Sequence, residues 1–215
     1  MELPPNRPPD HPPPNPAIFR FMLNFLLILA LIVGVLWFIS YRLAPTPVGP
    51  AAAPLPSEHP AALVRIYGAD VWGLRGRFAV HTWIATKAPN ADSYTTYQVL
   101  GWHLRRRGTV LSVTDGAPDT PWFGSQVILL YERSGDAAQG LVDAIDRAAR
   151  SYPYADRYTM WPGPNSNSFT QWVISQVPEL EAVLPQKAIG KNWLLENIDA
   201  AQALAAQTNV EPSGE

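Results

Sequence analysis

The chain contains no cysteine. Disulfide bridges, a thiolate nucleophile and metal sites with cysteine ligands are therefore excluded. Charged residues are few and nearly balanced, with a net charge of −2, so the composition gives no indication of nucleic-acid binding. A glycine-rich phosphate loop and a dinucleotide-binding motif are also lacking. Of the four histidines, only His81 and His103 lie in the part expected to fold, and their spacing is not that of a metal site. We therefore expect neither a metal nor a cofactor.

A long apolar run near the N-terminus is the clearest feature of the chain. Phe21 to Tyr41 contains only two markedly polar side chains other than the terminal tyrosine, Asn24 and Ser40, and both lie near its ends. A helix of about 20 such residues crosses the hydrocarbon core of a bilayer. The run is longer than the core of about 7–15 residues in a signal peptide. We predict an uncleaved transmembrane helix over residues 20–42 that contacts the lipid bilayer; cleavage near Gly49–Ala53 is the alternative.

Basic residues near this run indicate its orientation. Arg7 and Arg20 precede the apolar segment, whereas only Arg42 lies close after it. Positive charges near a span favour the cytoplasmic side. We therefore expect the N-terminus in the cytoplasm and the C-terminal domain on the external side.

Proline divides the rest of the chain. Residues 1–19 are rich in proline and predict a disordered tail, which could alternatively serve as a ligand for proline-binding modules. Residues 43–60 form a second segment rich in proline and alanine, and we interpret it as a spacer between bilayer and domain. Residues 61–206 should form the globular domain, and residues 207–215 a flexible tail.

Within the globular domain, strand patterns come first and helical patterns follow. The expected strands are residues 62–67, 77–86, 94–102, 109–113 and 126–132. The expected helices are residues 136–152, a segment from about 166–168 to 178, and residues 193–207. This order predicts an α+β domain with a largely antiparallel sheet and packed helices.

A histidine and a polar loop are the candidate chemical groups. His81 lies in the second expected strand, whose alternation directs it and Trp83 to one face. Residues 161–170 read Trp-Pro-Gly-Pro-Asn-Ser-Asn-Ser-Phe-Thr and end where a helix begins. A serine there would lie beside free N–H groups at the positive end of the helix dipole. The two groups could form a nucleophile–base pair, or they could be a helix cap and a packed histidine.

The order Asn165-Ser166-Asn167-Ser168-Phe169 resembles the Asn-Cys-Asn/Glu-x-Phe motif of circularly permuted papain-like enzymes, which include NlpC-type, PPPDE-type and lecithin:retinol acyltransferase-like proteins. In those families a histidine on an early strand precedes the nucleophile. The resemblance implies a circularly permuted papain-like fold, with Ser166 at the nucleophile position and His81 at the base position. Serine in place of cysteine implies either serine hydrolysis or a loss of activity, because a hydroxyl is a far weaker nucleophile than a thiolate.

Other residues complete this candidate site. Gln98 could orient the imidazole of His81, and the remaining candidates could line the site or stabilise an oxyanion: Asn165, Asn167, Ser168, Trp83 and Trp161. A hydrolase or acyltransferase would act on an amide or ester. The alternatives are an inactive papain-like binding module for an envelope peptide, glycan or lipid, and an accessory membrane protein.

A broader resemblance is to the proteobacterial membrane-anchored domain of unknown function 3750 family. It is carried by residues 78–84, 152–156, 161–169 and 188–191. It implies a bacterial origin and a membrane anchor, and it implies no activity. Together with the single span and the basic residues around it, the expected location is the bacterial inner membrane, with the C-terminal domain in the periplasm.

Three successive arginines, Arg105 to Arg107, precede Gly108. We expect them in a solvated turn at the end of a strand. The alternative is a contact with lipid phosphates or an anionic polymer.

Overall fold

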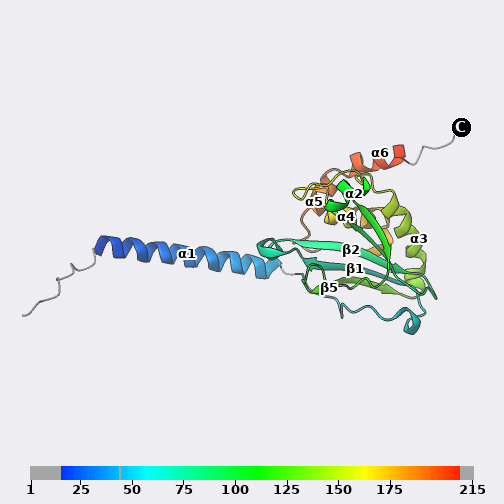
Figure 1. Cartoon of the computed structure of the whole chain (residues 1–215), viewed down its shortest axis with the longest axis horizontal. Coiled ribbons are helices and arrows are strands. Elements are labelled where there is room, and N and C mark those ends of the chain that lie inside the picture. The colour runs from blue at the N-terminus through cyan, green and yellow to red at the C-terminus, as the bar shows by residue number, and fades with distance from the viewer. Residues whose placement is uncertain (1–15, 44, 209–215) are drawn as a thin grey trace, which may run out of the picture. The chain divides into compact units, whose positions relative to one another are not determined.

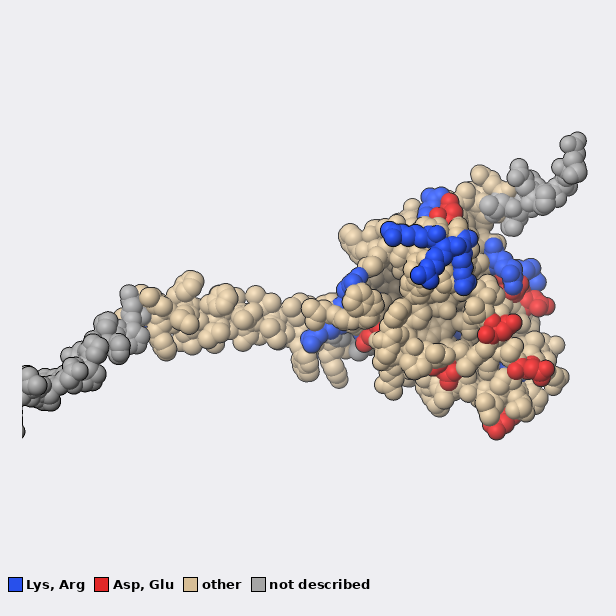
Figure 2. All heavy atoms as spheres, viewed as in Figure 1, with Lys and Arg blue, Asp and Glu red and all other residues tan. Residues whose placement is uncertain are grey.

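The computed structural model describes residues 16–43 and 45–208, and the chain divides into one unit that ends at Arg42 and a second that begins at Leu43. The first unit contains helix α1 (Pro16–Leu43), which Figure 2 shows with few charged side chains. Its segment Pro16–Ile39 has a mean hydropathy of 2.7, so α1 is long and apolar enough to cross a membrane. The helix begins earlier than expected, because proline fits the first turn of a helix. The rest of the predicted tail, residues 1–15, lies outside the described residues.

The second unit is built on one antiparallel sheet (Figure 1). Its strands are β1 (Leu63–Asp70), β2 (Val80–Lys87), β3 (Thr95–Val99), β4 (Leu111–Asp115) and β5 (Val127–Ser134), in the order β4-β3-β2-β1-β5. Every expected strand is present within a few residues of its predicted bounds. The α+β class with an antiparallel sheet is therefore confirmed.

The helices of this unit are α2 (Leu104–Arg107), α3 (Asp136–Arg150), α4 (Ser166–Gln176), α5 (Lys191–Glu196) and α6 (Ile198–Thr208). Short 3-10 turns occur at η1 (Pro56–Glu58), η2 (Gly73–Arg77), η3 (Gly101–His103) and η4 (Pro178–Leu180). The expected arginine turn is instead helix α2, which ends where Gly108 adopts a left-handed conformation with φ +69°. The single expected C-terminal helix is divided at Asn197, whose Nδ2 donates to the Trp193 carbonyl at 2.7 Å. Helix α6 extends two residues into the expected tail, and residues 209–215 lie outside the described part.

One face of the sheet carries the main core and is covered by α3 and α4 (Figure 1). Ile66 and Ile84 of the strands pack with Ile145 of α3 and with Phe169 and Trp172 of α4, all almost fully buried. Burying each such side chain stabilises the fold by about 1.5–3 kcal/mol before the cost of ordering it.

The opposite face is covered by the segment expected to be a spacer. We call residues 48–59 the strap. It runs along the sheet and is held by hydrogen bonds: the Val48 N–H donates to the Leu129 carbonyl at 2.9 Å, and the Tyr94 hydroxyl donates to the Pro54 carbonyl at 2.8 Å. Beneath it lies a second apolar cluster that includes Trp83. Residues 48–59 of the expected spacer are therefore packed against the sheet.

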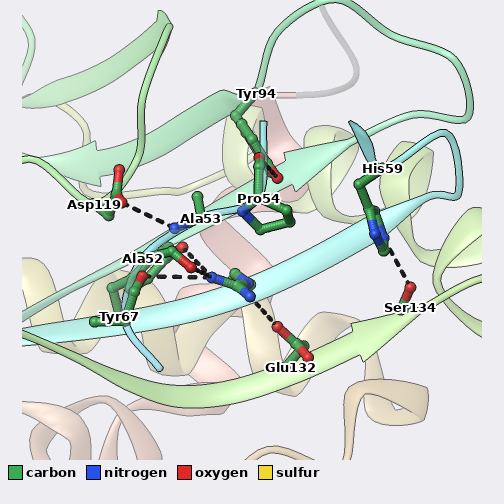
Figure 3. A network of polar contacts seen from close by, with 11 residues as sticks. Ala52, Ala53, Pro54, His59, Tyr67, Tyr94, Asp119, Glu132 and Ser134 are labelled. Carbon is green, nitrogen blue, oxygen red and sulfur yellow. Dashed lines mark hydrogen bonds and ion pairs between the residues drawn. The ribbon is translucent and has the colours of Figure 1, made fainter. Parts of the chain in front are cut away.

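The buried side chain of Arg65 is the centre of the strap contacts. Figure 3 shows its partners Ala52, Tyr67 and Glu132. Arg65 donates to the Ala52 carbonyl at 2.8 Å and to the Tyr67 hydroxyl at 3.1 Å, and it forms an ion pair with Glu132. The Ala53 N–H donates to the Asp119 carboxylate at 2.9 Å. The strap thereby contacts the loop between β4 and β5 as well as the sheet.

Candidate functional site

The polar motif at the start of α4 is mostly structural. The Asn165 side chain caps the helix, because its Oδ1 accepts from the N–H groups of Asn167 at 3.0 Å and Ser168 at 3.2 Å. The Ser168 hydroxyl accepts from the Asn165 N–H at 3.2 Å, which completes a capping box. The Asn165 Nδ2 donates to the carbonyls of Met160 and Ile189, both at 3.0 Å.

Asn167 fixes α4 to the sheet. Its Nδ2 donates to the carbonyls of Val80 at 3.0 Å and Ile189 at 2.8 Å, and its Oδ1 accepts from the Thr82 hydroxyl at 2.9 Å. The side chain is buried, so each of these bonds satisfies a group that has lost its water. Asn167 therefore determines where the helix begins relative to β2.

Glycines on either side of the motif allow this close packing. Gly190, at φ +105°, leaves no room for a Cβ, which would lie 2.4 Å from the Asn165 side chain. At Gly163, φ +149°, a Cβ would lie 2.9 Å from the Ser168 hydroxyl, which donates to the Gly190 carbonyl at 3.0 Å. The cap is thus enclosed by backbone on both sides.

Ser166 is the exception in the motif. Its side chain is almost buried, and within the described part of the chain its hydroxyl makes no hydrogen bond. Only its carbonyl is used, as the acceptor for the Thr170 hydroxyl at 3.2 Å. The packing of α4 therefore does not explain the hydroxyl of Ser166.

His81, on β2, is buried among aromatic side chains. Its ring stacks on Trp122 at a centroid distance of 3.7 Å and lies 5.6 Å from Trp83. Its Nε2 pairs with Gln98 Oε1 at 3.2 Å. Burial lowers the pKa of His81 to about 4, against the smaller opposing effect of the Gln98 hydrogen bond. The imidazole is therefore neutral near pH 7.

A cavity of about 550 Å³ brings His81 and Ser166 together at the end of the sheet where β2 begins and β3 ends. Such a volume is typical of small-molecule sites. Most of the wall is apolar and aromatic, from segments far apart in the sequence: Trp72, Phe78, Trp102, Trp122, Phe123, Tyr158 and Trp161. Several of these rings remain exposed, including Phe123 at 64% and Trp161 at 73%. Exposed aromatic groups around a cavity indicate a binding surface.

The two candidate catalytic residues approach this cavity differently. Thr82 contacts α4, so the neighbouring His81 lies on the face of β2 away from that helix. Ser166 belongs to α4 itself. In the described residues no hydrogen bond joins the Ser166 hydroxyl to the imidazole, whose side-chain partner is Gln98.

The N–H groups expected to stabilise an oxyanion are already engaged. Those of Asn167 and Ser168 donate to Asn165 Oδ1, and that of Phe169 donates to the Asn165 carbonyl at 3.0 Å. An oxyanion hole needs donors directed at the reacting oxygen. The first turn of α4 therefore serves its own cap in this conformation.

The other predicted site residues divide between cavity and core. Asn165, Asn167 and Trp161 border the cavity, whereas Ser168 is fully buried in the cap. Trp83 lies beneath His81, with its Nε1 donating to the Pro118 carbonyl at 2.8 Å.

Sequence reasoning missed the loop between β4 and β5, which supplies Trp122 and Phe123, and it missed Trp72, which directly precedes the turn η2. Two adjacent aromatic residues in a loop of small and polar residues were the available signal for that loop.

Comparison with known proteins gives one finding. No curated protein and no solved structure matches the chain. Residues 61–193 match a family described as "Protein of unknown function (DUF3750)", and this stretch includes the sheet, the cavity and the start of α5. Because the match covers more than half of the chain, the protein belongs to the DUF3750 family.

Proposed function

We propose that this protein is a membrane-anchored domain that binds the apolar part of a ligand in the aromatic cavity. The observation that carries the proposal is the cavity wall, in which rings from four separate segments surround about 550 Å³. Its polar groups are few: His81 is neutral near pH 7 because burial lowers its pKa, and the guanidinium of Arg75 contacts Trp72 and Met160. A site of this kind favours hydrocarbon or aromatic groups over charged ones.

A membrane anchor is consistent with a ligand that has an apolar part. Helix α1 would hold the domain at a bilayer, where amphiphiles are concentrated. We further propose a bacterial inner membrane as the location, with the domain on the periplasmic side. The basic residues before the span support this orientation.

Photoaffinity labelling tests the binding proposal. The full chain in nanodiscs of zwitterionic lipid is irradiated with a long-chain alcohol that carries an alkyl diazirine, and labelled peptides are identified by mass spectrometry. We expect label in the peptide that contains Trp122 and Phe123, which reports binding in the cavity. We also expect label in α1, which reports only that the probe has partitioned into the bilayer. Ala79 borders the cavity, so Ala79→Trp should remove the first label and leave the second.

A matched control separates filling of the cavity from general damage. Ala137 is exposed on α3 and does not border the cavity, so Ala137→Trp should leave both labels unchanged. Ile189→Trp fills the cavity from another side, and it replaces Ala79→Trp in the experiment if that variant does not fold. Label confined to α1 in the unmodified protein would rule out the proposal.

A second candidate function is acyl transfer by Ser166. It is favoured by one observation, the hydroxyl of Ser166 in the same cavity as His81 without a structural partner. His81 would have to exchange Gln98 for the serine on binding of substrate, since catalytic hydrogen bonds can tighten only in the complex. This second candidate function includes a papain-like relationship. The relationship is supported by the order along the chain, in which a histidine on a strand precedes a serine at the start of a helix.

Labelling with a fluorophosphonate probe distinguishes the two candidates. A serine hydrolase should be labelled at Ser166, and the label should disappear in Ser166→Ala and in His81→Gln. A chain that binds the diazirine alcohol without reacting with the fluorophosphonate is a binding protein.

A further inference from the structure

A second cavity adjoins the aromatic one. It has a volume of about 650 Å³ and is lined by Gly101, Trp102, Arg105, Arg106 and Phe123. Three of these residues, Gly101, Trp102 and Phe123, also border the first cavity. The rings of Trp102 and Phe123 meet edge to face at a centroid distance of 5.6 Å. This pair is therefore a wall shared by an apolar cavity and a basic one.

The arginines of the second cavity have free charges. Figure 2 shows basic side chains gathered over α2, the helix that carries Arg105 to Arg107. Among the described residues, none of the three forms an ion pair or a side-chain hydrogen bond. The pKa of His103 is lowered, first by burial and then by the charges of Arg107 and Arg106.

The other arginine near the ligand cavity is engaged. Arg75 borders the aromatic cavity, but its guanidinium lies 4.8 Å from the centre of the Trp72 ring and donates to Met160 Sδ at 3.2 Å. Arg105 and Arg106 differ from Arg75 because no side-chain partner in the described residues holds their guanidinium groups, so these groups can turn toward a bound anion.

We propose that the ligand is an anionic amphiphile, with its hydrocarbon chain in the aromatic cavity and a phosphate monoester over Arg105 and Arg106. This deepens the proposed function and depends on it. The chain would pass the wall formed by Trp102 and Phe123. Guanidinium groups bind phosphate oxygens in pairs, and two of them match the double charge of a phosphate monoester. A neutral chain would fill only the first cavity.

Equilibrium dialysis tests the head-group preference. The full chain in phosphatidylcholine nanodiscs is dialysed against octyl phosphate, octanoate or octanol, and uptake by empty nanodiscs is subtracted. We expect octyl phosphate to bind about tenfold more tightly than octanol, with octanoate between them, and the preference to shrink at high salt. Arg105→Gln/Arg106→Gln should abolish the preference without changing the affinity for octanol.

Two single variants serve as controls. Arg107 lies on the same helix but does not line the second cavity, so Arg107→Gln should retain most of the preference. Arg75→Gln should also retain it; a loss there instead of at α2 would overturn the assignment of the phosphate to Arg105 and Arg106.

The remaining outcomes separate the possible sources of failure. Equal binding of octyl phosphate and octanol contradicts the head-group proposal while the apolar site stands. Inorganic phosphate that competes as strongly as octyl phosphate indicates a site for free phosphate rather than for a lipid. Binding of none of the three chains contradicts the proposed function itself.

Discussion

The side chains of the motif at the start of α4 have different roles. Asn165 and Ser168 close the cap, Asn167 joins the helix to β2, and Ser166 alone presents a hydroxyl to the cavity. A papain-like nucleophile motif and a helix cap would use the same residue types at this place. Hydrogen-bond partners distinguish them residue by residue, and they assign three of the four residues to structure.

Asn167→Ala should destabilise the domain markedly. It removes three buried hydrogen bonds: the side-chain donor to the Val80 carbonyl, one of the two side-chain donors to the Ile189 carbonyl, and one of the two acceptors of the Thr82 hydroxyl. We expect a loss of about 2–4 kcal/mol in the free energy of unfolding, measured by urea titration of the full chain in nanodiscs. Ser166→Ala removes a hydroxyl without a partner and should change it by less than about 1 kcal/mol. Equal effects of the two changes would contradict the division of roles.

His81 should make the stability depend on pH. Its pKa falls from 6.5 to about 4 on folding, so between these values the unfolded chain binds more protons than the folded one. The free energy of unfolding should therefore drop by up to about 3 kcal/mol as the pH falls from 6.5 to 4. His81→Gln should flatten the thermal stability profile in this window. If the dependence of stability on pH persists in His81→Gln and disappears in His103→Gln, it is caused by His103 and the prediction for His81 is wrong.

At the scale of elements, the strap and the β4–β5 loop form a connected layer on the face of the sheet opposite α3 and α4. The Ala53 N–H bonds to Asp119, the Trp83 indole holds the Pro118 carbonyl, and a few residues further the loop supplies Trp122 to the cavity wall. The position of one cavity wall therefore depends on a segment that also leads to the membrane helix.

Arg65→Met should release the strap while the sheet stays folded. It removes the donor to the Ala52 carbonyl and the partner of Glu132, which is partly exposed and tolerates the loss. A hydrogen bond from a charged group is worth about 1.5–3 kcal/mol, so backbone amides in residues 48–59 should exchange about tenfold faster. Hydrogen–deuterium exchange with mass spectrometry measures this. Arg133→Met, which removes a surface ion pair with Glu181, should leave the strap protected.

The elements themselves could be predicted because their signals are local. Strand alternation placed His81 and Trp83 on one face of their strand, and helical spacing identified α3 and α4. The strap could not be predicted, because part of its order comes from hydrogen bonds with Tyr94, Asp119 and Leu129, which lie far along the chain. The cavity was missed for a similar reason: Trp122 and Phe123 lie in an aperiodic loop whose position depends on tertiary contacts.

At the scale of the whole molecule, an apolar helix and a ligand-sized aromatic cavity occur in one short chain. An amphiphile that leaves a bilayer needs a site that covers its hydrocarbon part, because exposure of each methylene to water costs about 0.8 kcal/mol. A tether that keeps the domain near the bilayer raises the effective concentration of such a ligand at the site. The anchor and the cavity therefore support the same proposed function.

The orientation of the chain can be tested with single cysteines, because the natural sequence has none and gives no background. Asp92 is exposed on the turn between β2 and β3, away from the cavity. In spheroplasts, Asp92→Cys should react with a membrane-impermeant maleimide, and Glu2→Cys should react only after lysis. The physical reason is the pair Arg7 and Arg20 before the span against Arg42 after it, since positive residues resist translocation. Labelling of Glu2→Cys in intact spheroplasts, with Asp92→Cys protected, would place the cavity in the cytoplasm, where its ligand would have to come from the inner leaflet.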